Sequence, residues 1–388
     1  MNICEITSTK KCMSCGGCSY ACPINAIEMQ FNKQDGFYRP NLNKERCVEC
    51  GKCLRVCPAT NQEETSLLGI YKNIYLAHST DAHVRHDATS GGVINSLARY
   101  LIDKDIVEGI LMMKYDQKSE VEMTPLYVTK ENKHVLEERP RDFASRYVSY
   151  PVLNALRKDR NTKRIAIVGT PCQLRSLSLN VGEFSNIYIF KIGITCSGGM
   201  SYKATEEYKR IKHLESAKMY YRGDGWPGKN SLILDRQKIE FVHTGSLFER
   251  MFSSQVFKNP GCRQCKDHFA EKADISFCDF WNEEESKTES EGNSCVIIRS
   301  KEAQDIFERM QQDSYIDVIR ELSEFETVNT QMHVLKAKKG DMHKKAYYRF
   351  FIKLIDIIFK YKLYKKFSFK TYQQICKYYW KICQKVSF

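Results

Sequence analysis

The sequence has no long apolar run, and its first residues contain no apolar leader. No stretch of about 18 apolar residues occurs among the 388, so we expect no membrane-spanning helix. The N-terminal segment MNICEITSTKKC lacks the apolar region of a secretory signal, which favours a cytoplasmic protein. Apolar residues make up 42% and charged residues 28% of the chain, which is typical of a folded protein with two or three domains.

Most of the chain also lacks a net charge. The formal charge is +13, but residues 336–388 contain 15 Lys and Arg against two Asp, which accounts for all of it. The residues before this tail carry as many acidic as basic side chains. A neutral body argues against nucleic-acid binding, which requires a basic surface.

Cysteine, in contrast, is abundant. Seventeen cysteines in a chain without a leader favour metal ligation in a reducing compartment over a disulfide framework. Eight of them form an internal repeat, in which C-x2-C-x2-C-x3-C-P occurs twice with an offset of 35 residues. In two-cluster ferredoxins, the fourth Cys of each run ligates the cluster of the other run. We therefore assign one 4Fe-4S cluster to Cys12, Cys15, Cys18 and Cys57, and a second to Cys47, Cys50, Cys53 and Cys22. Zinc is the alternative metal, although zinc sites usually use two separated C-x2-C pairs.

A polar linker over residues 61–66 precedes a region with the pattern of α/β structure, residues 67–330. We expect strands over residues 71–77, 164–168 and 187–194, and helices over residues 93–103 and 201–216.

Four more cysteines in this region stand out, namely Cys172, Cys196, Cys262 and Cys265. Two of them follow predicted strands, where open α/β sheets place their sites. Brought together, the four can hold a third cluster. The alternative is a structural role, which is common for a lone C-x2-C pair with two scattered cysteines.

Several short motifs occur in order after the ferredoxin repeat. They are Ala88-Thr89-Ser90-Gly91-Gly92, Arg146-Tyr147-Val148, Gly169-Thr170-Pro171-Cys172-Gln173, Cys196 with Ser201, Gly225-Trp226, Cys262-x2-Cys265 and Asp279-Phe280-Trp281. With these motifs, the chain from about Lys10 to Thr330 resembles the coenzyme F420 hydrogenase/dehydrogenase beta-subunit family, in the form with a fused two-cluster ferredoxin. It differs at Ser197 and Arg146, where the family commonly has His and Lys.

The resemblance implies a flavoprotein that binds FAD beside a cluster, which supports the third cluster. It also implies electron exchange with a deazaflavin, a ferredoxin or an organic substrate. We therefore expect an α+β or α/β chain in three parts. They are a bacterial-type ferredoxin fold in residues 1–62, an α/β FAD-binding catalytic domain with the third cluster in residues 67–330, and a basic, aromatic helical tail in residues 336–388.

The candidate flavin site begins at Ser90, Gly91 and Gly92, which precede a predicted helix. Free amides and the positive end of a helix dipole suit a pyrophosphate, and glycines allow its close approach. The alternative is an ordinary helix start with Ser90 as the N-cap.

The remaining candidates at the flavin follow from the resemblance. Arg146 would stabilise the reduced flavin, Trp226 and Trp281 would flank its ring, and Asp279 would contact a ribose or a proton. The alternatives are a surface ion pair for the Arg, core packing for the Trp residues and a strand-end cap for the Asp. Three histidines before the glycines are candidate proton donors, although each also suits a solvated loop: His78, His83 and His86.

Two functions compete. The first is a flavin- and iron–sulfur-dependent oxidoreductase that converts electron pairs into single electrons. The second is a non-catalytic iron–sulfur relay subunit of a larger redox complex. A relay needs no middle domain of this size, so we favour the enzyme.

The tail contains a predicted helix over residues 346–364. Its charges, Arg349, Lys353, Asp356 and Lys360, recur at steps of three and four and therefore share one helical face. Such a helix suits peripheral contact with an anionic membrane. Packing of its aromatic face on the body or on a partner protein is the alternative.

Overall fold

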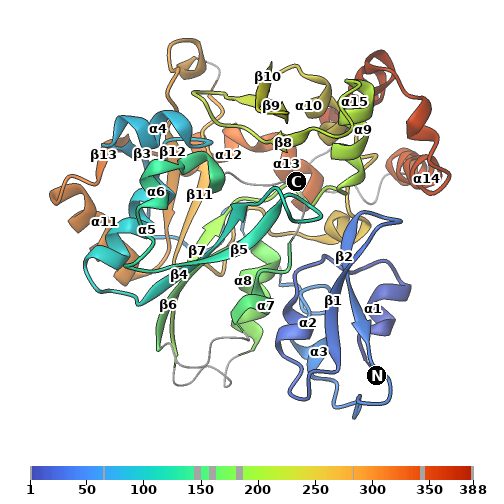
Figure 1. Ribbon diagram of the computed structural model, residues 1–388, viewed down its shortest axis with the longest axis horizontal. Helices are drawn as coiled ribbons and strands as arrows, with labels where there is room; N and C mark the ends of the chain where they lie inside the picture. Colours follow the sequence, from blue (N-terminus) through green and yellow to red (C-terminus); the bar gives the residue numbers. More distant parts are fainter. Residues whose placement is uncertain are drawn as a thin grey trace.

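The computed structural model describes residues 2–63, 66–143, 150–156, 163–180, 187–282, 284–340 and 346–385. The strands in these residues form three sheets, of two, three and eight strands. An N-terminal module and a helical tail flank the domain built on the largest sheet (Figure 1).

The N-terminal module is a short antiparallel hairpin with small helices beside it. Its elements are α1 (Cys4–Ser8), α2 (Gly17–Tyr20), β1 (Ile27–Asn32), β2 (Phe37–Leu42) and α3 (Lys52–Arg55). A glycine with positive φ, Gly16 or Gly51, precedes each of α2 and α3, and other residues rarely adopt this conformation. The cysteine repeat therefore folds as the same turn-and-helix unit twice.

The middle of the chain forms a mixed sheet with the strand order β13-β3-β12-β11-β7-β6-β4-β5. The neighbours β11, β7, β6 and β4 run parallel, and the outer pairs are antiparallel. The strands are β3 (Asn73–Ser79), β4 (Gly109–Tyr115), β5 (Met123–Val128), β6 (Arg164–Gly169), β7 (Tyr188–Ile194), β11 (Ile275–Asp279), β12 (Ser294–Ile298) and β13 (Ile316–Glu321).

Helices cover both faces of this sheet. Successive side chains of a strand point to opposite faces, so Ile165 and Ile167 pack in one core with Leu177, whereas Ala166 packs in another with Leu97. The helices are α4 (Ala82–Asp87), α5 (Val93–Asp103), α6 (Val135–Glu138), η1 (Pro140–Phe143), α7 (Leu153–Leu156), α8 (Pro171–Leu179), η3 (Glu285–Lys287), α11 (Lys301–Gln312), α12 (Glu324–Thr330) and α13 (Met332–Lys339). The N-terminal module lies against α7 and α8, which α2 contacts (Figure 1).

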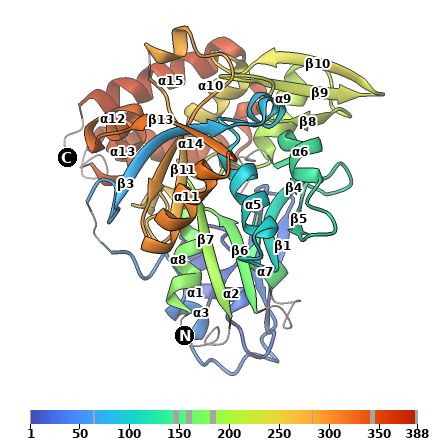
Figure 2. The same ribbon diagram turned by 90° about the vertical axis from the view of Figure 1, so that its left-hand side faces the viewer.

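A third core joins the small sheet to the tail. The sheet contains β8 (Lys218–Tyr220), β9 (Lys229–Leu234) and β10 (Gln237–Val242), and its helical neighbours are α9 (Lys203–Ile211), α10 (Leu247–Ser253), η2 (Pro260–Gln264), α14 (Ala346–Lys360), η5 (Leu363–Lys366) and α15 (Phe369–Gln384). Tyr208 and Phe248 of the body share this core with Phe351 and Tyr372 of the tail. One face of each tail helix is therefore packed on the body (Figure 2). No helix in the described residues is long and apolar enough to span a bilayer.

The expected elements of the middle region and of the tail are present, with two differences in length. Three strands and the helix over residues 93–103 occur where we expected them, as β3, β6, β7 and α5. The helix expected over residues 201–216 ends at Ile211, because His213 adopts a positive φ of 56° that breaks the helix. The tail helix likewise ends at Lys360 rather than near residue 364, with Lys362 at a φ of 54°.

Candidate functional site

Two cavities in the N-terminal module are each lined by four cysteines. The first is lined by Cys12, Cys15, Cys18 and Cys57 among apolar side chains, and the second by Cys22, Cys47, Cys50 and Cys53. The cysteines thus group as the crossed pattern of two-cluster ferredoxins requires. Cys50 is exposed and Cys47 is half-buried, so the second cavity is the one nearer to solvent.

A second group of cysteines lies at one edge of the large sheet. Cys172 lies in the first turn of α8 after β6, Cys196 follows β7, and Cys262 and Cys265 come from η2 and the residue after it. β6 and β7 are parallel, so their carboxyl ends meet at this edge, as in other open α/β sheets. The structure therefore brings together four thiols that lie far apart in the sequence.

The four thiols are close enough to affect one another's ionisation. Burial and the neighbouring Cys172 and Cys265, opposed by Lys338, raise the pKa of Cys196 to about 11. Burial, Cys196 and Cys172 likewise raise the pKa of Cys262. In the described residues, no three Cys, His, Asp or Glu side chains converge on the position of a single ion. Four clustered thiols are the kind of donor set that an iron–sulfur cluster requires.

Two lysines stand beside these thiols. Lys338 of α13 is 5% exposed, and its Nζ lies 3.5 Å from Cys265 Sγ and donates to the Asp267 carbonyl oxygen at 2.5 Å. Burial opposes its charge, but Cys265 and Cys196 outweigh burial and raise its pKa. Lys258 packs over Gly198 next to Cys262, and burial together with Lys338 lowers its pKa to about 8. Two cations in so buried a place indicate that the site is built for an anionic group.

This group directly adjoins the first ferredoxin cavity. Cys15 of that cavity, together with burial, raises the pKa of the Cys172 thiol, so the two side chains lie close together. Gly261 packs so closely on the module that a Cβ there would lie 2.5 Å from the carbonyl oxygens of Lys11 and Cys12.

Hydrogen bonds on both sides of this contact fix the module in place. Asn259 Nδ2 donates to Ser14 Oγ at 3.2 Å, and Ser176 Oγ donates to the Val56 carbonyl oxygen at 2.8 Å. The three cysteine groups therefore form one continuous series.

The candidate flavin residues lie along the same sheet edge, around Arg222. Its guanidinium donates to Asp279 Oδ2 at 2.5 Å and to the Thr89 carbonyl oxygen at 2.9 Å. It also lies 5.3 Å and 5.4 Å from the rings of Trp226 and Trp281, which contact each other at a centroid distance of 4.5 Å. Asp279, predicted as a ribose partner or a strand-end cap, is thus an ion-pair partner. Arg146 lies outside the described residues.

The glycine turn before α5 differs in detail from our expectation. The N-cap of α5 is Gly92, at a φ of 74°, and not Ser90, whose hydroxyl donates to the Asn293 carbonyl oxygen. A Cβ on Gly91 would lie 2.8 Å from the Ser294 amide nitrogen, so this glycine is required for packing on β12. The Asn95 and Ser96 amides both donate to the carbonyl oxygen of Gly92, so the first turn of α5 is closed on this glycine.

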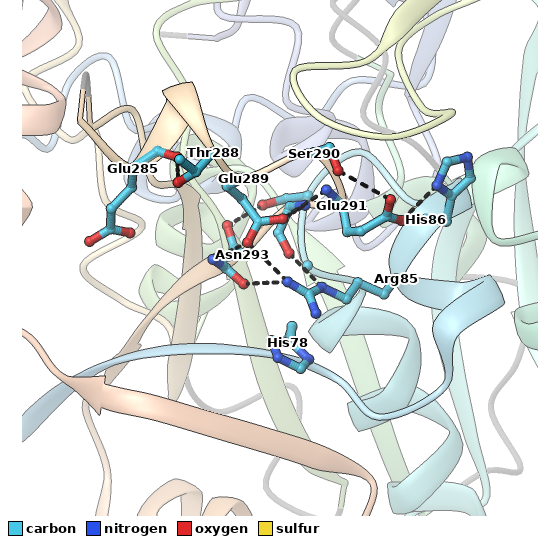
Figure 3. Close-up of polar contacts among 12 residues, drawn as sticks. His78, Arg85, His86, Glu285, Thr288, Glu289, Ser290, Glu291 and Asn293 are labelled. Carbon is cyan, nitrogen blue, oxygen red and sulfur yellow. Dashed lines mark hydrogen bonds and ion pairs between the residues drawn. The ribbon is translucent and has the colours of Figure 1, made fainter.

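A loop over residues 289–293 forms one wall of this turn, and α4 holds the loop in place. Arg85 donates to Glu289 Oε2 at 3.0 Å, to Asn293 Oδ1 at 3.1 Å and to the Gly292 carbonyl oxygen at 3.0 Å (Figure 3). His86 Nδ1 lies 2.6 Å from Glu291 Oε2 and its Nε2 lies 3.3 Å from Asp224 Oδ1. His86, predicted as a proton donor, is therefore paired with two carboxylates.

The other two histidines have different surroundings. His83 is exposed on α4, whereas the half-buried His78 lies on β3 with its Nδ1 near the Ser79 carbonyl oxygen. Neither contacts the Arg222 group by an interaction found in the described residues.

A polar chain connects the flavin candidates to the four cysteines. His268 is buried, with Nδ1 3.1 Å from the Cys196 carbonyl oxygen and Nε2 3.2 Å from Gln331 Oε1. Gln331 in turn donates to the Asp279 carbonyl oxygen at 2.9 Å. Burial and Lys338 lower the pKa of His268 to about 3, so it is neutral. His268 thus places an imidazole beside the Cys196 backbone, although the residue that follows Cys196 is Ser197 and not the His that is common in the family.

Sequence reasoning did not identify Arg222, Lys258, His268 or Lys338. None of them lies in a motif or at a ligand spacing, and α13, which carries Lys338, follows the region of the motifs. Only the glycine-rich segment around Arg222, RGDGWPG, marks its neighbourhood as a specialised turn.

Comparisons with known proteins agree on one family. Residues 74–157 and 162–323 match the N-terminal and C-terminal models of "Coenzyme F420 hydrogenase/dehydrogenase, beta subunit", and residues 11–61 match a 4Fe-4S dicluster domain. The F420-dependent formate dehydrogenase subunit beta of Methanocaldococcus jannaschii is 25% identical, over 63% of this chain and 60% of its own length. The chain thus spans less than two thirds of that relative.

Two further comparisons concern Methanosarcina barkeri. Its coenzyme F420 hydrogenase subunit beta is 21% identical, over 72% of this chain and 97% of its own length. A chain from a structure of its F420-reducing [NiFe] hydrogenase complex superposes with a TM-score of 0.54 at 18% identity, over 72% of this chain and 93% of that one. The second result shows a shared fold.

Proposed function

The chain belongs to the coenzyme F420 hydrogenase/dehydrogenase beta-subunit family, and from this we propose that it is a flavin- and iron–sulfur-dependent oxidoreductase. It would pass electrons between FAD, two 4Fe-4S clusters in the N-terminal module and a third cluster held by Cys172, Cys196, Cys262 and Cys265. Its partner would be a deazaflavin coenzyme, a redox protein such as ferredoxin, or an organic substrate. Relatives named as F420-dependent favour the deazaflavin.

One observation carries this proposal, namely the contact between the two kinds of cysteine site. Gly261, directly before Cys262, packs against the backbone carbonyl oxygens of Lys11 and Cys12. The Cys196 backbone is linked through His268 and Gln331 to Asp279. An electron would thus meet the candidate flavin residues, then the four-cysteine group, then the first and second N-terminal sites. The exposed Cys50 supports an exit to a partner protein at the far end.

FAD, when bound, exchanges two electrons and a proton with an organic partner and single electrons with a cluster. The residues of this chain supply its surroundings. Arg222 offers a fixed positive charge beside two indole rings, and burial among them keeps water away from it. The start of α5 offers backbone amides for phosphate. His86, held by Glu291 and Asp224, is a proton-carrying group at the edge of the Gly225–Trp226 turn.

The alternative is a relay subunit that holds clusters and no flavin. Anaerobic purification, acid release of bound cofactor and chromatography separate the two functions. We expect about one FAD per chain. Full iron content without flavin would contradict the enzyme and favour the relay.

Arg222→Ala sharpens this test. Loss of its charge and of its contacts to Asp279 and Thr89 should reduce the flavin content at least tenfold while the iron content stays unchanged. Arg236→Ala, an exposed arginine at the β9–β10 turn, is the matched control and should keep its flavin. Equal flavin in both variants would remove Arg222 from the site.

A further inference from the structure

We propose that the two tail helices, α14 and α15, form a surface that docks on an anionic lipid bilayer. This inference goes beyond the proposed redox function and does not depend on it. The tail follows the part of the chain that matches the family, which ends at residue 323.

The two helices form an antiparallel hairpin. The rings of Phe351 in α14 and Tyr378 in α15 lie 5.6 Å apart. Tyr347 is one turn before Phe351, and its ring lies 6.0 Å from Nζ of Lys385, which is nearly two turns after Tyr378. One stripe of α14 is buried in the core shared with the body: Tyr348, Phe351, Ile355 and Ile358. Because this stripe anchors the hairpin, its orientation on the body is fixed.

A second apolar stripe of α14 faces away from the body. Phe350 is 69% exposed, Leu354 46%, Ile357 48% and Tyr361 63%. Their spacing of four, three and four places them on one helical face. Large side chains are rarely left exposed in such a row, which indicates a surface that is covered when the protein works.

Exposed lysines occur on both helices. On α14, Lys353 and Lys360 are exposed next to the exposed stripe, and on α15 four exposed lysines recur along one face: Lys370, Lys377, Lys381 and Lys385. The one acidic residue in residues 346–385 is Asp356, and its carboxylate is bound to Arg263 at 2.6 Å. The outer surface of the hairpin therefore combines apolar side chains with charge of a single sign.

This combination favours a lipid surface over a protein. The centres of protein interfaces are depleted in lysine, and protein surfaces usually offer charges of both signs. At a bilayer, in contrast, rings and aliphatic chains enter the headgroup region while lysines reach the anionic phosphates. Tyr361 at the end of the exposed stripe is a residue type that is common at this depth.

The docking surface is joined to the redox centre by the ion pair of Asp356. Its partner Arg263 lies between Cys262 and Cys265 in sequence and is itself buried. Attachment at α14 would therefore hold the four-cysteine group at a fixed position relative to the membrane.

Flotation of the full chain with vesicles tests the proposal. Vesicles of phosphatidylcholine alone are compared with vesicles that also contain phosphatidylglycerol, at low and high salt. We expect binding to the anionic vesicles only, at least tenfold weaker at high salt, together with a fluorescence blue shift on binding in Phe350→Trp that the natural chain does not show. Equal binding to both vesicles, or binding to neither, would overturn the proposal.

Two sets of variants locate the surface. Phe350→Ser, Leu354→Ser and Ile357→Ser together, or the four α15 lysines changed to Gln, should each weaken vesicle binding at least tenfold. The matched control changes four exposed lysines of the body to Gln, namely Lys118, Lys130, Lys238 and Lys301. Iron content and thermal unfolding confirm that each variant is folded. If the control loses as much binding as the α15 set, or if the tail variants lose a protein partner but no vesicle binding, the proposal is wrong.

Discussion

The two kinds of cysteine site in this protein are built in opposite ways. The N-terminal cavities take all eight cysteines from residues 12–57, with three from one run and one from the other in each cavity. The four-cysteine group takes its members from three segments between residues 172 and 265. The parallel pairing of β6 with β7, and the pairing of Met200 with Lys258 before η2, bring them together. A site made by a local repeat can be read from spacing, whereas a site made by topology cannot.

The surroundings of the two sites differ as well. The first N-terminal cavity is lined by apolar side chains such as Ile3, Ile6 and Met29. The four-cysteine group has Lys338 and Lys258 beside it. Reduction of a cluster adds a negative charge, and a nearby cation favours the state with more negative charge. The four-cysteine site should therefore be reduced more easily than the first N-terminal site, so that electrons are held next to the flavin candidates.

Breaking the contact between the two sites should have the largest effect. In Gly261→Ala, the new Cβ would lie 2.5 Å from two backbone carbonyl oxygens of the module, and backbone cannot move aside cheaply. We expect a loss of about 1 to 3 kcal/mol of stability and faster proteolysis in the 61–66 linker. Gly245→Ala is the control: its Cβ meets nothing within 4 Å, so any loss there comes from its φ of 74°, a conformation that Gly261 does not adopt. Equal unfolding temperatures and cleavage rates for the natural chain and Gly261→Ala would contradict the close contact.

Removing Lys338 should reduce the difference in ease of reduction between the two kinds of cysteine site. Lys338→Met removes the cation that lies 3.5 Å from Cys265 Sγ, so the four-cysteine cluster should become harder to reduce. We expect at least a tenfold change in its one-electron reduction equilibrium, which corresponds to about 59 mV, measured by a redox titration followed by EPR. The N-terminal signals should stay where they are. Lys301→Met, on the surface of α11, is the control, and an equal shift in both variants would refute a specific role for Lys338.

The smallest expected effect is on the pH dependence of stability, and it concerns His86 near the candidate flavin residues. The hydrogen bond to Glu291, opposed by burial and helped by Asp224, raises the pKa of His86 above its ordinary value. A group whose pKa is raised on folding contributes stability below its unfolded pKa of about 6.5, and loses it as the pH rises through the folded value. His86→Gln should therefore lower the unfolding temperature more at about pH 5.5 than at about pH 8.5. A difference that is the same at both pH values would exclude this ion pair.

Several elements of the fold could be predicted from the sequence because each has a local pattern. The β3, β6 and β7 strands are short apolar runs that end in small residues, and α5 has a strong apolar stripe after a glycine turn. The helix ends near His213 and Lys362 could not be predicted, because a positive φ in a residue other than glycine has no marker in the sequence.

The residues of the candidate site fall into the same two groups, those with a local sequence pattern and those without one. The cysteine repeat, the glycine turn and Trp226 stand in motifs with a local pattern. Arg222 and Lys338 instead act through partners that lie 57 and 73 positions away in the sequence, Asp279 and Cys265. Such residues are chosen by the position of a strand or a helix, and only the folded chain reveals them.

The central claim is that the four cysteines at the sheet edge hold a third iron–sulfur cluster in series with the two of the N-terminal module. Iron analysis of anaerobically prepared protein tests it most directly, in the natural chain and in a variant with both Cys262→Ser and Cys265→Ser. We predict about twelve iron atoms per chain in the first and about eight in the second, with the N-terminal cluster signals retained. An iron content that is the same in both proteins would contradict the third cluster and the electron path built on it.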